Sequence, residues 1–156
     1  PYYALQLAMK AGSFNAAVAY SATGTDSGTL YNGSVLSPWG GMPAFTQGMV
    51  TRHQFFADTT AWKLSAGYNL KDLTSQDITA SAYYTSFKVD SDNSYTKAVT
   101  TTEPGFDIIY NNAGIKNLQL RLRGNFPNDF RKDVRAATLN ETTSWKEYRV
   151  IANYNF

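Results

Sequence analysis

Charged residues that alternate with apolar ones are the strongest candidates for chemistry in this sequence. Arg121 and Arg123 alternate with leucines between positions 118 and 123, and Arg149 alternates with apolar residues between 148 and 154. Residues two apart on an extended strand share a face, so these arginines should lie opposite the apolar side chains. Arginine stays ionised, and its planar fork fits carboxylates. Three arginines on adjacent strands could therefore form a positive stripe that guides anionic solutes.

Other charged residues extend this stripe or oppose it. Alternation places Lys63 on the same polar face, and Glu147 lies two positions before Arg149. If Arg121 instead pairs with Asp107, and Arg149 with Glu147, the arginines brace a sheet and contact no solute. The sequence leaves both interpretations open.

Little in the sequence points to catalysis or to a cofactor. His53 is the single histidine and cysteine is absent, so a metal cluster of His and Cys is excluded. His53 has no nucleophile-elbow motif nearby, although a hydrolase assembled from several strands would be recognised only by its geometry. Acidic residues of the long connections, Glu103 among them, could hold calcium, but they follow no calcium-loop pattern. We expect no cofactor, no metal and no enzymatic activity.

Alternation of apolar and polar residues predicts seven strands of an antiparallel sheet. The predicted strands are 3–10, 14–21, 59–70, 77–88, 104–111, 118–126 and 147–156. Their connections alternate between short turns and long polar segments, the long ones being 22–54, 89–103 and 127–144. Outer-membrane barrels have short periplasmic turns and longer extracellular loops. The predicted fold class is therefore all-β, an antiparallel transmembrane β-barrel.

The composition fits a protein that crosses a membrane with strands. The chain has 156 residues, 15% of them aromatic, yet its mean hydropathy is only −0.36. This balance is expected when apolar residues face lipid and polar residues face a wet lumen. The net charge of +2, without a basic run, argues against nucleic acid as a partner. Aromatic residues near strand ends should form interfacial girdles. They are Tyr3, Tyr20, Tyr68, Tyr110, Tyr154 and Phe156.

The last predicted strand alternates, with Ile151 as the exception, and ends on Phe156, like the C-terminal signal of bacterial outer-membrane barrels. Such barrels have an even number of strands, so seven should form one wall of a larger barrel. We therefore expect residues 1–156 to be the C-terminal part of a single barrel domain. The alternatives are an eight-stranded barrel with an extra strand at 30–35 and a soluble β-sandwich.

Three segments resemble the C-terminal portion of OprD-type porins, a family that includes epsilonproteobacterial major outer-membrane proteins. They are Ser37–Thr46 (SPWGGMPAFT), Leu118–Arg123 (LQLRLR) and Glu147–Tyr154 (EYRVIANY), of which the first is the specific one. The resemblance implies the last seven strands of an eighteen-stranded barrel, a monomer or trimer with a narrow pore lined by arginines.

The same resemblance gives the long connection 22–54 a role. It would correspond to the seventh extracellular loop, which in the family folds inward and narrows the pore. Tyr31, Trp39, Gly40 and Gly41 are the residues expected to shape that constriction. The alternative for Trp39 is that it packs the loop against the barrel wall.

Together these expectations describe a channel in the outer membrane of a Gram-negative bacterium. It would pass small anionic or carboxylate-bearing solutes by passive diffusion. Its partners would be outer-membrane lipid, the strands that complete the barrel, small solutes and, if the porin is a homo-oligomer, further copies of itself. A non-conducting barrel that serves as an adhesin or anchor through its loops is the main alternative, and a membrane enzyme is a third.

Overall fold

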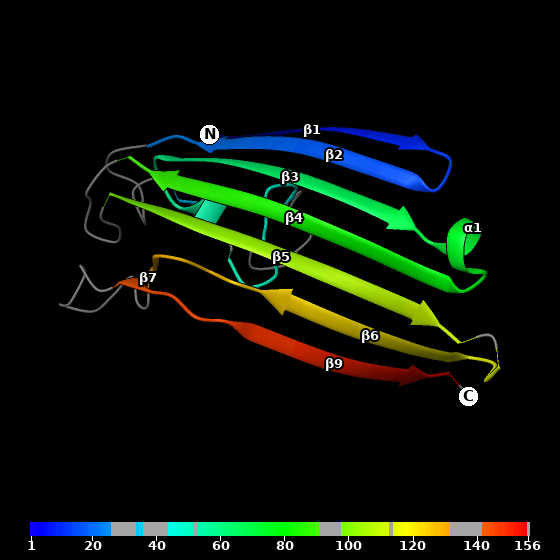
Figure 1. Cartoon of the computed structure of the whole chain (residues 1–156). Helices are drawn as coiled ribbons and strands as arrows, with labels where there is room; N and C mark the ends of the chain where they lie inside the picture. The colour runs from blue at the N-terminus through cyan, green and yellow to red at the C-terminus, as the bar shows by residue number, and fades with distance from the viewer. Residues whose placement is uncertain are drawn as a thin grey trace.

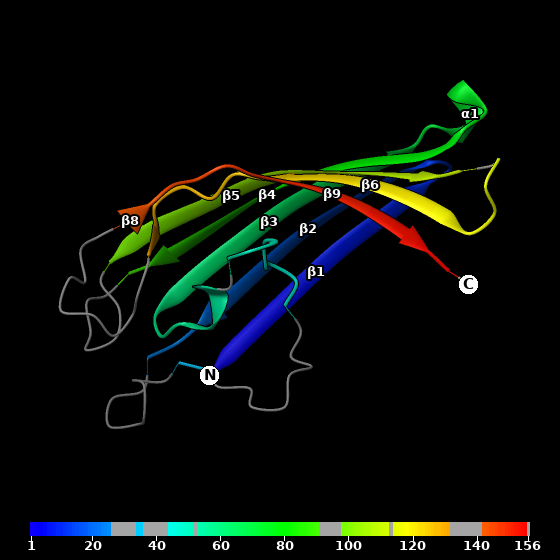
Figure 2. The same ribbon diagram turned by 90° about the horizontal axis from the view of Figure 1, so that it is seen from below.

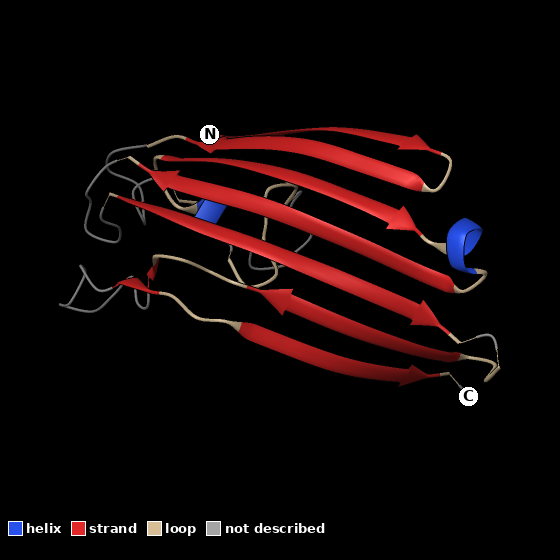
Figure 3. Ribbon diagram, in the orientation of Figure 1, coloured by secondary structure: helices blue, strands red, loops and turns tan. Residues whose placement is uncertain are grey.

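The computed structural model describes residues 1–25, 34–35, 44–51, 53–90, 98–112, 114–131 and 142–155. Within them the protein is all-β, with one antiparallel sheet of seven strands and almost no helix (Figures 1 and 3). Each strand pairs with the next of the seven along the chain. The all-β antiparallel prediction is confirmed. The strands are β1 (Tyr2–Ala11), β2 (Phe14–Thr23), β3 (Thr59–Asn69), β4 (Asp77–Val89), β5 (Val99–Asn111), β6 (Leu118–Asn125) and β9 (Glu147–Tyr154).

Short elements occupy the connections. A single-turn helix, α1 (Lys71–Thr74), joins β3 to β4, and a 3₁₀ turn, η2 (His53–Phe55), precedes β3. Between β6 and β9, β7 (Phe130–Arg131) and β8 (Thr142–Thr143) form a two-stranded sheet. The predicted long connections 22–54 and 127–144 therefore contain regular structure, and β2 extends two residues into the first of them.

The short turns lie at one end of the sheet and the long connections at the other (Figure 1). The tightest turn joins β1 to β2, where Ala11 pairs with Phe14 and only two residues connect the strands. Gly12, the first of the two, has a positive φ of 56°. Two-residue hairpins need this left-handed backbone, which glycine adopts at no steric cost.

The predicted connection 89–103 is wrong at its second end, because β5 begins at Val99 and continues through Pro104. Residues 99–102 are Val-Thr-Thr-Thr, β-branched residues that favour a strand. Pro104 is tolerated because its nitrogen faces the β6 side of β5, where β6 has already ended at Asn125. On that side the Pro104 carbonyl accepts a hydrogen bond from the Phe126 N–H at 3.0 Å.

The sheet has one apolar and one polar face. Monomeric soluble proteins rarely expose so continuous an apolar surface. The polar face is the concave side of the curved sheet, and the segment before β3 lies against it (Figure 2). The large exposed side chains of the apolar face include Tyr3, Leu5, Leu7, Met9, Val18, Tyr20, Trp62, Leu64, Tyr84, Ile108, Leu120, Leu122, Tyr148, Val150 and Tyr154.

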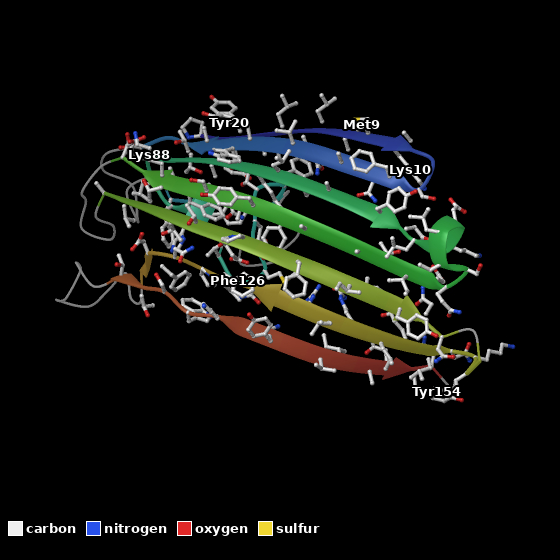
Figure 4. The ribbon with its side chains drawn as sticks, viewed as in Figure 1. Met9, Lys10, Tyr20, Lys88, Phe126 and Tyr154 are labelled. Carbon is white, nitrogen blue, oxygen red and sulfur yellow. The ribbon has the colours of Figure 1, made fainter. Side chains whose placement is uncertain are left out.

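Two rows of aromatic residues border the apolar face. The row near the long connections, here the upper row, comprises Tyr3, Tyr20, Trp62, Tyr84 and Tyr148, and the lower row comprises Phe14, Tyr68, Tyr110 and Tyr154. Figure 4 shows Tyr20 toward the long connections and Tyr154 near the turns. On β2, β3 and β9 the two rows are six positions apart, about 20 Å along a strand. The side chains in the band between them are mainly aliphatic, with Phe106 of β5 as an aromatic exception.

Both rows run obliquely across the sheet. If the cross-strand pairs are followed from Tyr148 on β9 across the sheet, they end at Met9 on β1. The upper row, however, has Tyr3 on β1, six positions before Met9. The upper row therefore shifts by six positions over six strand-to-strand steps, or one residue per strand. With a rise of about 3.3 Å per residue and about 4.8 Å between strands, the strands are tilted by about 35° to an axis perpendicular to the row. Strands of closed barrels are tilted by a similar angle.

Two glycines allow aromatic rings to lie across neighbouring strands. A Cβ atom at Gly105 would overlap the ring of Tyr83 on the polar face, and one at Gly124 would overlap the ring of Phe106 on the apolar face. Tyr83 and Gly105, and likewise Phe106 and Gly124, are direct cross-strand partners. These ring contacts hold β4, β5 and β6 in register.

The sheet is not closed. β1 and β9 lie at its two edges, and each has one side without a partner strand among the described residues. The helices of the described part of the chain are too short and too polar to cross a membrane.

Candidate functional site on the polar face

Residues 44–51, here called the inner segment, cross the polar face of the sheet (Figures 1 and 2). The segment consists of two tight turns. The Gln47 N–H donates to the Ala44 carbonyl at 3.1 Å, and the Gly48 N–H donates to the Thr51 carbonyl at 3.1 Å. Short-range bonds of this kind leave other backbone groups of the segment available for the sheet.

A row of three directly paired residues binds the inner segment. Lys63 on β3 pairs with Thr85 on β4, which pairs with Glu103 on β5. The Lys63 Nζ donates to the Gln47 carbonyl at 2.7 Å, and the Thr85 hydroxyl donates to the Thr46 carbonyl at 2.6 Å. The cation and the hydroxyl thus bind carbonyl oxygens of the segment, while Glu103 binds its N–H groups.

Glu103 is fully buried, and its carboxylate accepts hydrogen bonds from three successive N–H groups. Met49 N–H donates at 2.7 Å, Val50 N–H at 3.3 Å and Thr51 N–H at 2.9 Å. The Thr51 hydroxyl donates at 2.7 Å, and the Tyr83 hydroxyl also donates. Successive N–H groups that converge in this way make an anion-binding nest. Here the anion is a side chain of the sheet itself.

The predicted arginines lie on the polar face, opposite the leucines of β6, so their predicted facing is confirmed. Asp107 on β5 lies between two of them. The Arg121 Nε donates to the two Asp107 carboxylate oxygens at 2.7 and 2.9 Å, and its Nη2 also donates. Arg123 reaches the same carboxylate at 3.2 and 3.3 Å. One buried carboxylate therefore holds two guanidinium groups.

Arg149 pairs with Glu147 on the same strand, through its Nε, and Asn125 donates to Glu147 at 3.4 Å. Arg149 is also the direct cross-strand partner of Arg123. The arginines thus form both the stripe and the braces that the sequence left as alternatives. Arg121 has the strongest bracing contacts, whereas Arg123 is held at longer distances and keeps donor groups for other partners.

A polar pocket of about 370 Å³ lies between the inner segment and the strands. Gly48 and Met49 of the segment line one side of it, and Lys63, Tyr83 and Arg123 line the others. Ser65, Ser81 and Asp107 also contribute. With Lys63 and the arginines facing Asp107, Glu147 and Glu103, the cluster has four cations and three carboxylates, hence a net charge of +1.

His53 lies away from this cluster. It is buried, and its ring centroid lies 4.9 Å from Phe56, 5.8 Å from Phe87 and 4.9 Å from Phe130. The described residues bring together no group of three or more His, Cys, Asp or Glu that could hold a metal ion.

The structure places the predicted charged residues close together, whereas all four predicted constriction residues lie outside the described residues. Arg121, Arg123, Arg149, Glu147 and Asp107 share one polar surface, and Lys63 lies on the same face under the inner segment. The other predicted positions lie outside the described residues. They are Tyr31, Trp39, Gly40, Gly41 and, of the girdle residues, Phe156.

From the sequence, Glu103 was considered only as a loop acid that could hold calcium, and Tyr83 was not singled out. Glu103 was assigned to the predicted connection 89–103, although the β-branched run before it favours a strand. Tyr83 carried a usable signal, since it is an aromatic residue in the polar row of β4, between Ser81 and Thr85.

No family model, curated protein sequence or solved structure matches the chain. The resemblance to OprD-type porins therefore stays a prediction.

Proposed function

We propose that this chain forms part of the wall of a β-barrel channel in a bacterial outer membrane, and that the channel passes small solutes with a preference for anions. We further propose that it is the C-terminal part of an OprD-type porin. The observation that carries the proposal is the pair of parallel aromatic rows on the apolar face, staggered by one residue per strand.

The rows support a membrane location. Aromatic residues favour the interface between lipid and water, and aliphatic residues favour the hydrocarbon region. The aliphatic band spans about 20 Å along the strands, of the same order as the roughly 25 Å apolar band of outer-membrane barrels. The stagger supports a barrel, because strands can close into a barrel only when they are tilted and staggered.

The polar face supports a channel. It is concave (Figure 2), and it carries Arg123 and Lys63 around a polar pocket that the inner segment only partly covers. The net charge of +1 favours anions modestly, since most of the positive charge is offset by Asp107, Glu147 and Glu103. Carboxylates suit the donor groups that Arg123 does not use for Asp107.

The test is conductance of the intact protein in planar lipid bilayers. We expect discrete single-channel steps, and a reversal potential in a KCl gradient that shows Cl⁻ to be more permeant than K⁺. A preparation of the same protein unfolded in urea serves as the control for leakage. A folded, inserted protein that gives no steps would overturn the channel proposal and favour the non-conducting adhesin or anchor.

A further inference from the structure

We propose that Glu103 is the positioning residue that fixes the inner segment across the pore, and with it the roof of the pocket beside Arg123. The inference rests on the proposed channel function, but the contacts that carry it belong to the sheet and the segment alone.

The burial of Glu103 requires the segment. An ionised carboxylate removed from water is costly unless charges or hydrogen-bond donors replace the water. Glu103 is fully buried, and four of the five groups that donate to it belong to the inner segment: the N–H groups of 49–51 and the Thr51 hydroxyl. Without the segment, Tyr83 would be the one donor left among the residues that the structure describes.

The segment is in turn shaped for the carboxylate. Gly48 is buried, and a Cβ atom there would overlap both the Glu103 carboxylate and the Thr51 hydroxyl. The backbone can approach so closely only because position 48 is glycine. The Met49 N–H also lies 3.2 Å from the Tyr83 hydroxyl, so the strand-borne acid and phenol meet the segment at one point.

The contacts of Glu103 determine the pocket. Gly48 and Met49 form its wall on the segment side, and both adjoin the N–H groups that Glu103 binds. Lys63 and Thr85 hold the preceding residues 46 and 47. Glu103 is therefore the contact that holds the second turn of the segment, the part that faces Arg123.

The test compares two variants that each remove one negative charge from the same polar face. Glu103→Gln keeps the shape of the side chain but loses the charge that the N–H groups bind. Glu147→Gln is the matched control, because Glu147 contacts Arg149 and Asn125 and not the inner segment. The chain contains no cysteine, so Met49→Cys in each background gives a single thiol on the segment.

We expect a water-soluble thiol reagent to label this single thiol at least roughly tenfold faster in folded Glu103→Gln than in the parent, because charge-assisted hydrogen bonds hold the segment closed. Labelling in Glu147→Gln should match the parent. In bilayers Glu103→Gln should give a larger unit conductance than the parent, and a larger one than Glu147→Gln, whose main effect should be on ion preference.

Equal labelling and equal conductance for folded Glu103→Gln and the parent would overturn the inference. If Glu103→Gln does not fold, Thr51→Val removes one donor from the segment side, and it should accelerate labelling in the same direction but less. Unchanged labelling in Thr51→Val would then overturn the inference. Labelling that responds as expected in a protein that never conducts would refute the channel proposal and leave the role of Glu103 standing.

Discussion

At the scale of single residues, the charge balance of the site depends on Asp107. Its carboxylate accepts hydrogen bonds from Arg121 and Arg123 at the same time. It therefore links β5 to β6 and also offsets part of the positive charge of the two arginines. Arg121 binds it through two nitrogens, a geometry that planar guanidinium groups favour. Arg123 makes the longer contacts and is the better candidate for contact with a solute.

Replacing Asp107 by Asn should make the proposed channel more selective for anions. The change adds one net positive charge where Arg121 and Arg123 lie, and it leaves their guanidinium groups without a counter-charge. The reversal potential in a KCl gradient should shift toward that of Cl⁻, and the shift should shrink at high salt because screening weakens the field. Stability should fall by about 1–3 kcal/mol through lost charge-assisted hydrogen bonds.

Asp58→Asn serves as the control for that variant. It removes the same charge outside the cluster, and asparagine tolerates the positive φ of 55° at this position. A reversal potential that is the same in the two variants would show that Asp107 and its arginines do not face the permeation path.

At the scale of elements, alternation was sufficient to predict seven strands and the facing of β6, because one face of each strand is consistently apolar. It failed at β5, where Pro104 concealed the first five residues of the strand. It also could not place Lys63, Thr85 and Glu103 in one row, because cross-strand register depends on pairing between segments distant in sequence. The inner segment was expected to fold inward only through the family resemblance.

The apolar band between the aromatic rows gives a prediction about depth. Leu64 on β3 lies between the rows, whereas Ser86 on β4 lies on the same face, beyond Tyr84 toward the long connections. In lipid vesicles Leu64→Arg should cost about 2–4 kcal/mol of folding free energy, and Ser86→Arg about 0–1 kcal/mol. Urea titration of both variants measures the difference. Similar costs at the two positions would mean that the rows do not mark the borders of a membrane.

At the scale of the whole molecule, β1 and β9 each have one edge to which no other described strand is paired. Unpaired strand edges promote association with other strands. Within the proposal, partner strands of a larger barrel occupy both edges. The direction of backbone groups on β9 makes this testable, because the Asn155 N–H points to β6 and N–H direction alternates along a strand.

Proline substitution at two neighbouring residues of β9 should therefore show whether a partner strand pairs with the open side of β9. The N–H of Asn153 points toward β6, and that of Ala152 points to the open side. If a partner strand occupies the open side, Ala152→Pro and Asn153→Pro should lower the folded yield of the intact protein by similar amounts, because each removes one ladder hydrogen bond. The folded fraction after refolding into vesicles, followed by electrophoretic mobility without heating, measures this. Normal folding of Ala152→Pro alone would show that β9 is a true edge.

The one-residue stagger also arranges the charges by height. Lys63 and Arg149 are four strands apart, and the register offsets them by four positions, so they lie at the same level along the axis of a tilted barrel. Glu103 and Glu147, two strands apart and offset by two positions, share a level nearer the long connections. In the proposed channel, a solute that travels from the long connections toward the turns would thus pass the level of the two carboxylates before the level of the two cations. Anions would be repelled at the first level before they are attracted at the second, so the order of the two levels would give the proposed channel different entry rates from its two sides.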